Sequence, residues 1–177
     1  MNITILVADE RHHSYAEEIV ETIYMAAQQR GTGIAKRTPQ YITTKIDEGK
    51  AIIALAEDGR FAGFCYIESW QDKKFVATSG LIVSPDFRHQ HLAKRIKAVA
   101  VDRARELFPG AKLFGITTSA AVMKINTDLG YKPVHFSELP SDDVFWMGCS
   151  SCPNFDILER TQRSMCLCTA MLHKGEP

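Results

Sequence analysis

The alternation of hydrophobic and polar residues predicts a strand and two helices in the first part of the chain. Residues 1–8 alternate loosely and are rich in Ile, Thr and Val, which is typical of a strand. A shorter helix between Thr38, its N-cap, and Gly49 lies further along the chain. Between the two, apolar residues recur at helical spacing and predict a helix from about Arg11 to Gln29: Ala16, Ile19, Val20, Ile23 and Ala27.

A hairpin and a strand with an interior glycine come next. Two apolar runs, Ala51–Glu57 and Phe61–Trp70, are joined by Asp58-Gly59, a dipeptide that favours a tight turn. Phe75–Val83 is predicted to be the following strand. Gly80 lies inside it, and an interior glycine usually marks a bulge or a place where another backbone comes close.

The second half of the chain alternates helices and strands. A helix that ends at about Glu106 is predicted from the apolar spacing of Leu92, Ile96, Val99, Ala100 and Leu107. The segments that follow are a strand, a helix closed by Gly130, a further strand and, after a less regular stretch, a last strand: Lys112–Thr117, Ala120–Leu129, Tyr131–Phe136 and Met165–His173. No repeat or linker divides the chain, so residues 1–177 are predicted to form one domain.

The composition is that of a soluble globular domain. Of 177 residues, 45% are hydrophobic and 24% are charged, so a sizeable core can form. Basic and acidic residues number 21 each, which gives no global field to attract nucleic acid or an anionic membrane. The chain has no apolar run long enough for a membrane span and no signal peptide, so we expect a cytoplasmic protein.

The segment from Leu81 to Lys94 carries the clearest chemical signal. A strand leads through a short turn into the N-terminus of a helix, where the first amides have no intrahelical partners and can bind an anion such as a pyrophosphate. The alternative is a solvated basic face on an amphipathic helix. Four cations are predicted to surround this helix end: Arg88, Lys94, Arg95 and Lys97.

The pattern Arg88-x-x-His91-x-Ala93, together with the order of elements, resembles the GNAT acetyltransferase superfamily. The acetyl-CoA signature of that family is Arg or Gln, two residues, Gly, one residue, then Gly or Ala. Gly80 and the sequence Leu129-Gly130-Tyr131, similar to the family's closing Leu-Gly-Phe, add to the resemblance. It implies an α/β fold with a mixed, mostly antiparallel sheet flanked by helices and a Cys-containing insertion, residues 138–170, before the last strand.

The resemblance implies acetyl-CoA or another short acyl-CoA as co-substrate. In the family the pantetheine arm pairs with the main chain of the strand before the signature, and the pyrophosphate lies on the amides of residues 88–93. His91 stands where the family has glycine, and we expect helical φ and ψ there, which need no glycine. The implied contacts are Leu81, Ile82, Val83, Arg88, His89, Gln90, His91, Leu92, Ala93, Lys94 and Asn126.

The residues implied for catalysis depart from the family pattern. Asn126 replaces a tyrosine that protonates the departing thiolate in many relatives, and an amide can donate only a hydrogen bond. Ala77-Thr78-Ser79 lacks the glutamate base of many relatives, so Glu68 is the candidate base, directly or through one water. The alternative for Glu68 is a solvated or cross-strand charge. We expect direct attack on the thioester, with the amide near Val83 as oxyanion donor.

The acceptor is predicted to bind beside the loop between the first two helices. In the family this loop lies over the acceptor side, so its three cations, Arg30, Lys36 and Arg37, are candidates to hold a carboxylate. An exposed loop with charges for solubility is the alternative. Residues 30–35, 115–118 and 122–126 and the cysteines give a narrower resemblance, to a bacterial GNAT group associated with arginine biosynthesis. That implies glutamate, or else ornithine, as acceptor.

Two other functions stay open on the sequence. One is a catalytically weak acyl-CoA-binding regulatory module, which the replacements at His91 and Asn126 favour. The other is a protein lysine acetyltransferase. A homodimer also stays open.

Four of the five cysteines lie close together near the C-terminus and predict either a metal site or reduced structural thiols. Cys149 and Cys152 have the spacing of a zinc knuckle. Cys166 and Cys168 are placed on the last predicted strand, where residues two apart point to the same face, so both sulfurs could reach one ion. Zinc is the metal this set favours, although free cysteines are also common core residues.

Overall fold

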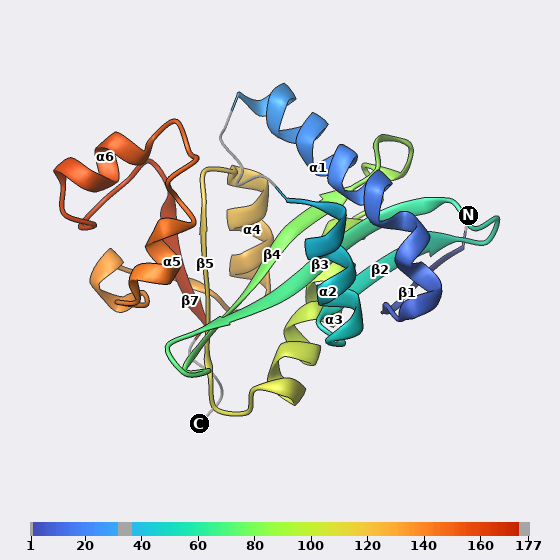
Figure 1. The fold of residues 1–177 in the computed structure, drawn as a ribbon, viewed down its shortest axis with the longest axis horizontal. Coiled ribbons are helices and arrows are strands. Elements are labelled where there is room, and N and C mark those ends of the chain that lie inside the picture. The colour runs from blue at the N-terminus through green and yellow to red at the C-terminus, as the bar shows by residue number, and fades with distance from the viewer. Residues whose placement is uncertain (1, 32–36, 174–177) are drawn as a thin grey trace.

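The computed structural model describes residues 2–31 and 37–173, which form a seven-stranded sheet (Figure 1). The strand order is β1-β2-β3-β4-β5-β7-β6, and every neighbouring pair is antiparallel except β4 and β5. This confirms the predicted mixed, mostly antiparallel sheet. The strands are β1 (Ile3–Val7), β2 (Ala51–Ala56), β3 (Phe61–Trp70), β4 (Phe75–Val83), β5 (Lys112–Thr117), β6 (Lys132–Pro133) and β7 (Thr169–His173).

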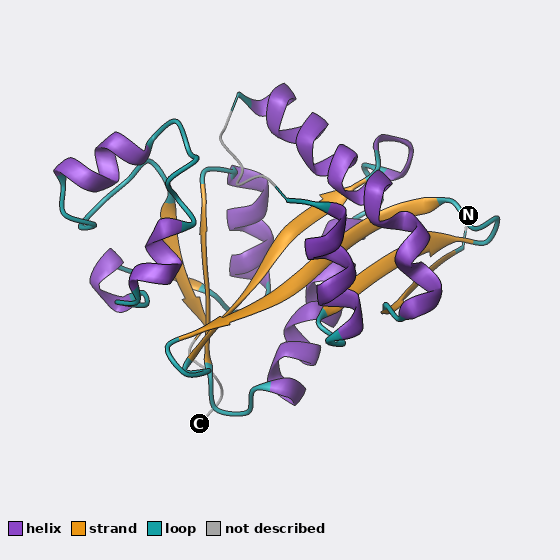
Figure 2. Cartoon of the chain, viewed as in Figure 1, coloured by secondary structure: helices purple, strands orange, loops and turns teal. Residues whose placement is uncertain are grey.

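Helices cover both faces of the sheet (Figure 2). α1 and α2 lie on one face and α3 and α4 on the other, whereas α5 and α6 stand beside β5 and β7 (Figure 1). No helix in the described ranges is both long and apolar enough to cross a bilayer. The helices are α1 (Ala16–Arg30), α2 (Pro39–Asp47), α3 (Leu92–Leu107), α4 (Ala120–Asp128), α5 (Asp143–Met147) and α6 (Phe155–Arg160).

The alternation of side chains along β3 explains how one strand fills two cores. Phe64 and Tyr66 pack in the cluster that includes the buried residues of α1 and α2. Cys65 and Ile67 point the other way, into the clusters built on α3. Because all four are buried, β3 reads as a continuous apolar run rather than an alternating one.

β4 and β5 separate partway along their length. They pair only from Phe75 to Ala77, and Figure 1 shows the two strands diverging beyond that point, with α4 behind the gap. The predicted bulge is confirmed, because the β3–β4 register shifts between Phe64 and Tyr66, opposite the segment that contains Gly80. The backbone of Gly80 is left-handed, with φ +63°, a conformation that glycine adopts at little cost.

The boundaries of the first helix and of the strand after Gly130 differ from the prediction. The first helix starts with a 3-10 segment, Glu10–Tyr15, because Asp9 caps that turn, and regular α-helix begins only at Ala16. The predicted strand at Tyr131–Phe136 shrinks to the two residues of β6, of which Pro133 has no N–H to donate to a ladder.

The segment between β6 and β7 also differs from the prediction. Two short helices, α5 and α6, occupy it, and neither was predicted. The last strand starts at Thr169 rather than Met165, so Cys166 and Cys168 precede it. Cys166 and Cys168 therefore do not share one face of a strand, contrary to the prediction.

Candidate functional site

The turn between β4 and α3 has a backbone suited to an anion. After a 3-10 turn at Pro85–Phe87, His89 has φ +63° and His91 has φ +55° and ψ +18°. Left-handed residues alternating with ordinary ones turn successive backbone amides toward one concavity, an arrangement that binds phosphates. The expectation of helical φ and ψ at His91 was wrong, because this residue closes the turn before the helix begins.

The N-terminus of α3 adds further amides to this turn. α2 and α4 carry side-chain caps, from the hydroxyls of Thr38 and Ser119, but no side chain caps α3. The amides of its first turn therefore have no partner from a capping side chain. In a helix of 16 residues these amides and the helix dipole favour a negative group.

The predicted cations contribute unequally to this site. Arg88 is exposed, and its Nε donates to the Val83 carbonyl at 3.4 Å. Lys94 Nζ donates to a carboxylate oxygen of Asp128 at 3.0 Å, and Arg95 Nη2 donates to the Ile3 carbonyl of β1 at 3.3 Å. Lys97 was predicted to lie with the other cations at the helix end, and this was wrong. It is only 3% exposed, and burial lowers its pKa.

At residues 81–83 and at the start of α3, main-chain groups rather than side chains are available to bind a ligand. Beyond Ala77 the edge of β4 has no strand partner on the β5 side among the described residues. The side chain of Ile82 packs in the core beside α1 and α2, and Leu81 and Val83 pack in the cluster of α3. Leu92 is buried and Ala93 half-buried, whereas the side chains of His89 and Gln90 are exposed.

A cluster of polar side chains lies on the α2 face, next to the bulge. Glu68 Oε2 accepts a hydrogen bond from the Tyr41 hydroxyl at 2.5 Å and forms an ion pair with Lys45 Nζ at 2.8 Å. The guanidinium of Arg37 donates to the Tyr66 hydroxyl at 2.9 and 2.8 Å, and the Tyr41 and Tyr66 rings meet edge to face. We call these five residues the Glu68 cluster.

The Glu68 cluster adjoins the bulge through the ring of Tyr66. A Cβ added to Gly80 would lie 2.6 Å from that ring, so strand and ring are in contact. Burial raises the pKa of Tyr41 well above its usual range, and the neighbouring Tyr66 and Glu68 raise it further. Tyr41 thus stays protonated and donates to Glu68.

Sequence reasoning found two members of the Glu68 cluster, Glu68 and Arg37, and missed the other three. The signal for these lies in spacing: Tyr41 and Lys45 are four apart on one helix, and Tyr66 is two residues before Glu68 on one strand. Arg30 is exposed at the end of α1, where its Nε donates to the Ala26 carbonyl. Lys36 lies outside the described residues.

Asn126 is buried on α4, beside β5 and β7. It is 1% exposed, its amide nitrogen lies 3.5 Å from Met171 Sδ, and its carbonyl oxygen has no partner in the described structure. The hydroxyls of Thr78 and Tyr131 are also buried, close to where β4 and β5 part, and they interact with each other: burial raises the pKa of Tyr131 to about 12, and Thr78 lowers it. Buried polar groups are normally satisfied, so the side-chain oxygen of Asn126 fits a region that accepts a polar group.

The four C-terminal cysteines line one small cavity. They are half-buried and share its wall with Ile116, Phe136 and Phe155. Burial, followed by the neighbouring thiols, raises the pKa of Cys149 to about 11 and that of Cys168 to about 12. In the described ranges no three of the cysteine, histidine and carboxylate side chains converge as metal ligands.

Comparison with known families gives one match. Residues 36–124, half of the chain, match the model of the acetyltransferase (GNAT) family. No curated protein matches the chain in sequence.

Solved structures share the fold at low sequence identity. N-acetylglutamate synthase from Neisseria gonorrhoeae, complexed with coenzyme A and N-acetyl-glutamate, is 15% identical with a TM-score of 0.69; the match covers 100% of this chain but only 36% of that one. The putative acetyltransferase yncA from Salmonella typhimurium, with acetyl-CoA, is 15% identical with a TM-score of 0.67, covering 100% of this chain and 96% of that one. A phosphinothricin acetyltransferase from Sinorhizobium meliloti, in complex with AcCoA, is 17% identical with a TM-score of 0.64, covering 97% and 87%.

Proposed function

The chain belongs to the GNAT acetyltransferase family, and from this premise we propose that it moves an acetyl or similar short acyl group from CoA to the amino group of a small amino acid. The observation that carries the proposal is the position of two sites along one strand, β4. The turn of His89 and His91 lies at the end of β4, and the Glu68 cluster lies against Gly80 of the same strand. A donor and an acceptor bound there would come together where β4 leaves β5. In this proposal residues 1–177 act as one catalytic domain.

The backbone of this chain provides most of the proposed donor site. Amides of residues 88–93 would hold the pyrophosphate, and Arg88 would add charge at the rim. The free edge of β4 at Leu81 and Val83 would pair with the pantetheine arm. The buried side-chain carbonyl of Asn126, which has no partner in the described structure, supports a polar group at the inner end of this slot.

Glu68 is the residue we propose as general base. Its Oε2 accepts from Tyr41 and pairs with Lys45, whereas Oε1 accepts only a long bond, at 3.4 Å, from the Ser69 amide among the described residues. Oε1 is therefore the atom that can take a proton from the acceptor ammonium, directly or through one water. Lys45 and Tyr41 fix the carboxylate in place and act as positioning residues.

The other groups in the proposed mechanism stabilise developing negative charge by hydrogen bonds and transfer no proton. A CoA thioester supplies an activated carbonyl and a good leaving group. An amide near Val83 would donate to the carbonyl oxygen as it becomes negative. The side-chain amide of Asn126 would donate a hydrogen bond to sulfur, after moving from its present contact with Met171.

Glutamate is the acceptor we propose, in arginine biosynthesis. Arg37 is in place for this role because its guanidinium lies beside Tyr66 and the Glu68 cluster, where it could also bind a substrate carboxylate. Arg30 and Lys36 would supply further charge from the same connection. N-acetylglutamate synthase is among the structural neighbours, and at 15% identity it supports the fold and only suggests the substrate.

Steady-state kinetics test the proposal. With acetyl-CoA, the acceptors glutamate, ornithine, aspartate and a lysine peptide are compared by release of free thiol. We expect glutamate to give the highest kcat/KM, Arg37→Gln to raise its KM, and Glu68→Gln to lower kcat by about 100-fold. Arg163→Gln, on a surface ion pair with Asp143, is the control and should behave as wild type.

Each part of the proposal can fail separately. If the lysine peptide is the best acceptor, or if Arg37→Gln leaves the glutamate KM unchanged, the acceptor assignment is wrong although the donor site stands. Asn126, whose amide has no proton to give to the departing thiolate, favours a second function, a binding module with little turnover. CoA binding by calorimetry without turnover of any acceptor would support that module.

A further inference from the structure

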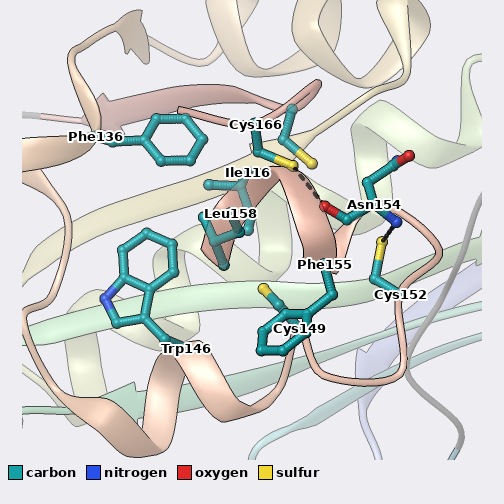
Figure 3. A pocket seen from close by; sticks show the side chains of 10 residues that line it. Ile116, Phe136, Trp146, Cys149, Cys152, Asn154, Phe155, Leu158 and Cys166 are labelled. Atoms are coloured by element: carbon teal, nitrogen blue, oxygen red, sulfur yellow. Dashed lines mark hydrogen bonds between the residues drawn. The ribbon is translucent and has the colours of Figure 1, made fainter. Parts of the chain in front are cut away.

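The four C-terminal cysteines come from two separate segments and meet around one cavity. Cys149 and Cys152 lie between α5 and α6, and Cys166 and Cys168 lie between α6 and β7. All four line a cavity of about 30 Å³ (Figure 3). The fifth cysteine, Cys65, is buried in β3, within a different core cluster.

Hydrogen bonds link the cysteine-bearing segments to one another. The amide of Cys152 donates to the Cys149 carbonyl at 2.9 Å, so this pair sits on a tight turn. The amide of Asn154 donates to Cys152 Sγ at 3.5 Å, and Cys166 Sγ donates to the Asn154 carbonyl at 3.8 Å. Figure 3 shows Cys152 and Cys166 on either side of Asn154, joined to it by these two bonds. One peptide segment therefore ties together sulfurs that are far apart in the sequence.

The helices of this segment pack on the sheet through Phe145, Trp146 and Leu158, but both helices are short. α5 has five residues and α6 has six, too short for either helix to be stable by itself. If the thiols served only as apolar filling, they would be expected to close the space among them, because protein interiors are close-packed. Instead they surround a cavity with room for a small ion, whose other walls are the apolar side chains of Ile116, Phe136 and Phe155.

We propose that Cys149, Cys152, Cys166 and Cys168 bind one thiophilic divalent cation of the zinc class as a structural tetrathiolate site. Four thiols lose their protons, the cation forms four metal–sulfur bonds, and four protons pass to solvent. The amide of Asn154 continues to donate to the Cys152 sulfur, which favours its thiolate form. With four protein ligands the cation has no open coordination position, so its role is to stabilise the α5–α6 segment and not to take part in catalysis.

Binding requires the sulfurs to turn toward one another. With the rotamers described here, no three ligand atoms converge on one point. Each sulfur can move by rotation about a single Cα–Cβ bond among staggered positions, while the backbone that carries the four residues stays in place. The proposal does not depend on the proposed acyl transfer.

Metal analysis tests the proposal directly. Protein purified under reducing conditions without added metal should hold about one equivalent of zinc per chain, and Cys152→Ser or Cys166→Ser should lower this at least tenfold. The control is Cys65→Ala, which should keep the full equivalent. Circular dichroism shows whether each variant is folded.

A second measurement uses the wild-type chain alone, in case the serine variants do not fold. After removal of metal with a chelator under reducing conditions, cobalt(II) should restore one equivalent and give the thiolate charge-transfer bands and visible bands of a tetrahedral site. Less than about a tenth of an equivalent of zinc, with no cobalt bands, overturns the proposal. A disulfide within the set, seen as an intact mass lower by two hydrogens in protein isolated without reductant, also overturns it.

Discussion

Replacing His91 with glycine should make the protein more stable and strengthen CoA binding. The backbone at His91 has φ +55° and ψ +18°, and for a residue with a Cβ this left-handed conformation costs about 1–2 kcal/mol. Glycine removes that cost but loses about 0.5–1 kcal/mol because its unfolded chain is freer. The net gain is about 0.5–1 kcal/mol, since the imidazole is exposed and caps nothing. For a chain of this length the melting temperature should rise by roughly 1–4 °C.

The matched variant His91→Ala separates the backbone from the side chain. Alanine removes the imidazole but keeps the Cβ, so its unfolding free energy should stay within about 0.5 kcal/mol of wild type. Urea unfolding of the three proteins, with calorimetry of CoA binding, makes the comparison. We expect only glycine to raise stability and to give the lowest Kd, because it lets a phosphate approach the turn most closely. Equal stability of the glycine and alanine variants would refute the left-handed backbone at this position.

Three further predictions follow from the same region. Arg88→Glu should weaken CoA binding about tenfold in calorimetry, and unchanged affinity would remove this turn from the donor site. Gly80→Ala should lower the unfolding free energy in urea by about 2–3 kcal/mol, because its Cβ would lie 2.6 Å from the Tyr66 ring. The control is Gly110→Ala, with φ +79° and open space, which should lower it by only about 1 kcal/mol; equal losses would contradict the clash at Gly80. Lys97→Met should stabilise the protein by on the order of 1 kcal/mol at neutral pH, because burial disfavours the ammonium. The pKa of Lys97 in the folded state lies below its unfolded value of 10.5, so the unfolding free energy of the wild type should rise as the pH increases toward 10.5. The extra stability of the methionine variant should shrink over the same pH range, and a difference that stays constant with pH would contradict the burial of a charged amine.

Local sequence signals were enough to locate most of the strands and helices. The Asp58-Gly59 turn, the cap at Thr38 and the bulge at Gly80 all appear where they were predicted, because each depends on the residues of a few neighbouring positions. The turn that we propose for phosphate binding was located in the same way, from a strand, a short turn and a helix start within residues 81–94. α5 and α6 were missed because each is too short to show a helical period.

The tertiary structure decided what each charged or polar side chain faces. The sequence determined that Lys97 lies on α3, but packing against the sheet decided that its amine is buried instead of facing a phosphate. The sequence offered Glu68 as a carboxylate on a strand, and the fold placed Tyr41 and Lys45 against it from a separate helix. It likewise brought Cys149 to the same cavity as Cys168. Periodicity and turn chemistry act over a few residues and can be read along the chain, whereas contacts between distant segments depend on how the helices pack on the sheet.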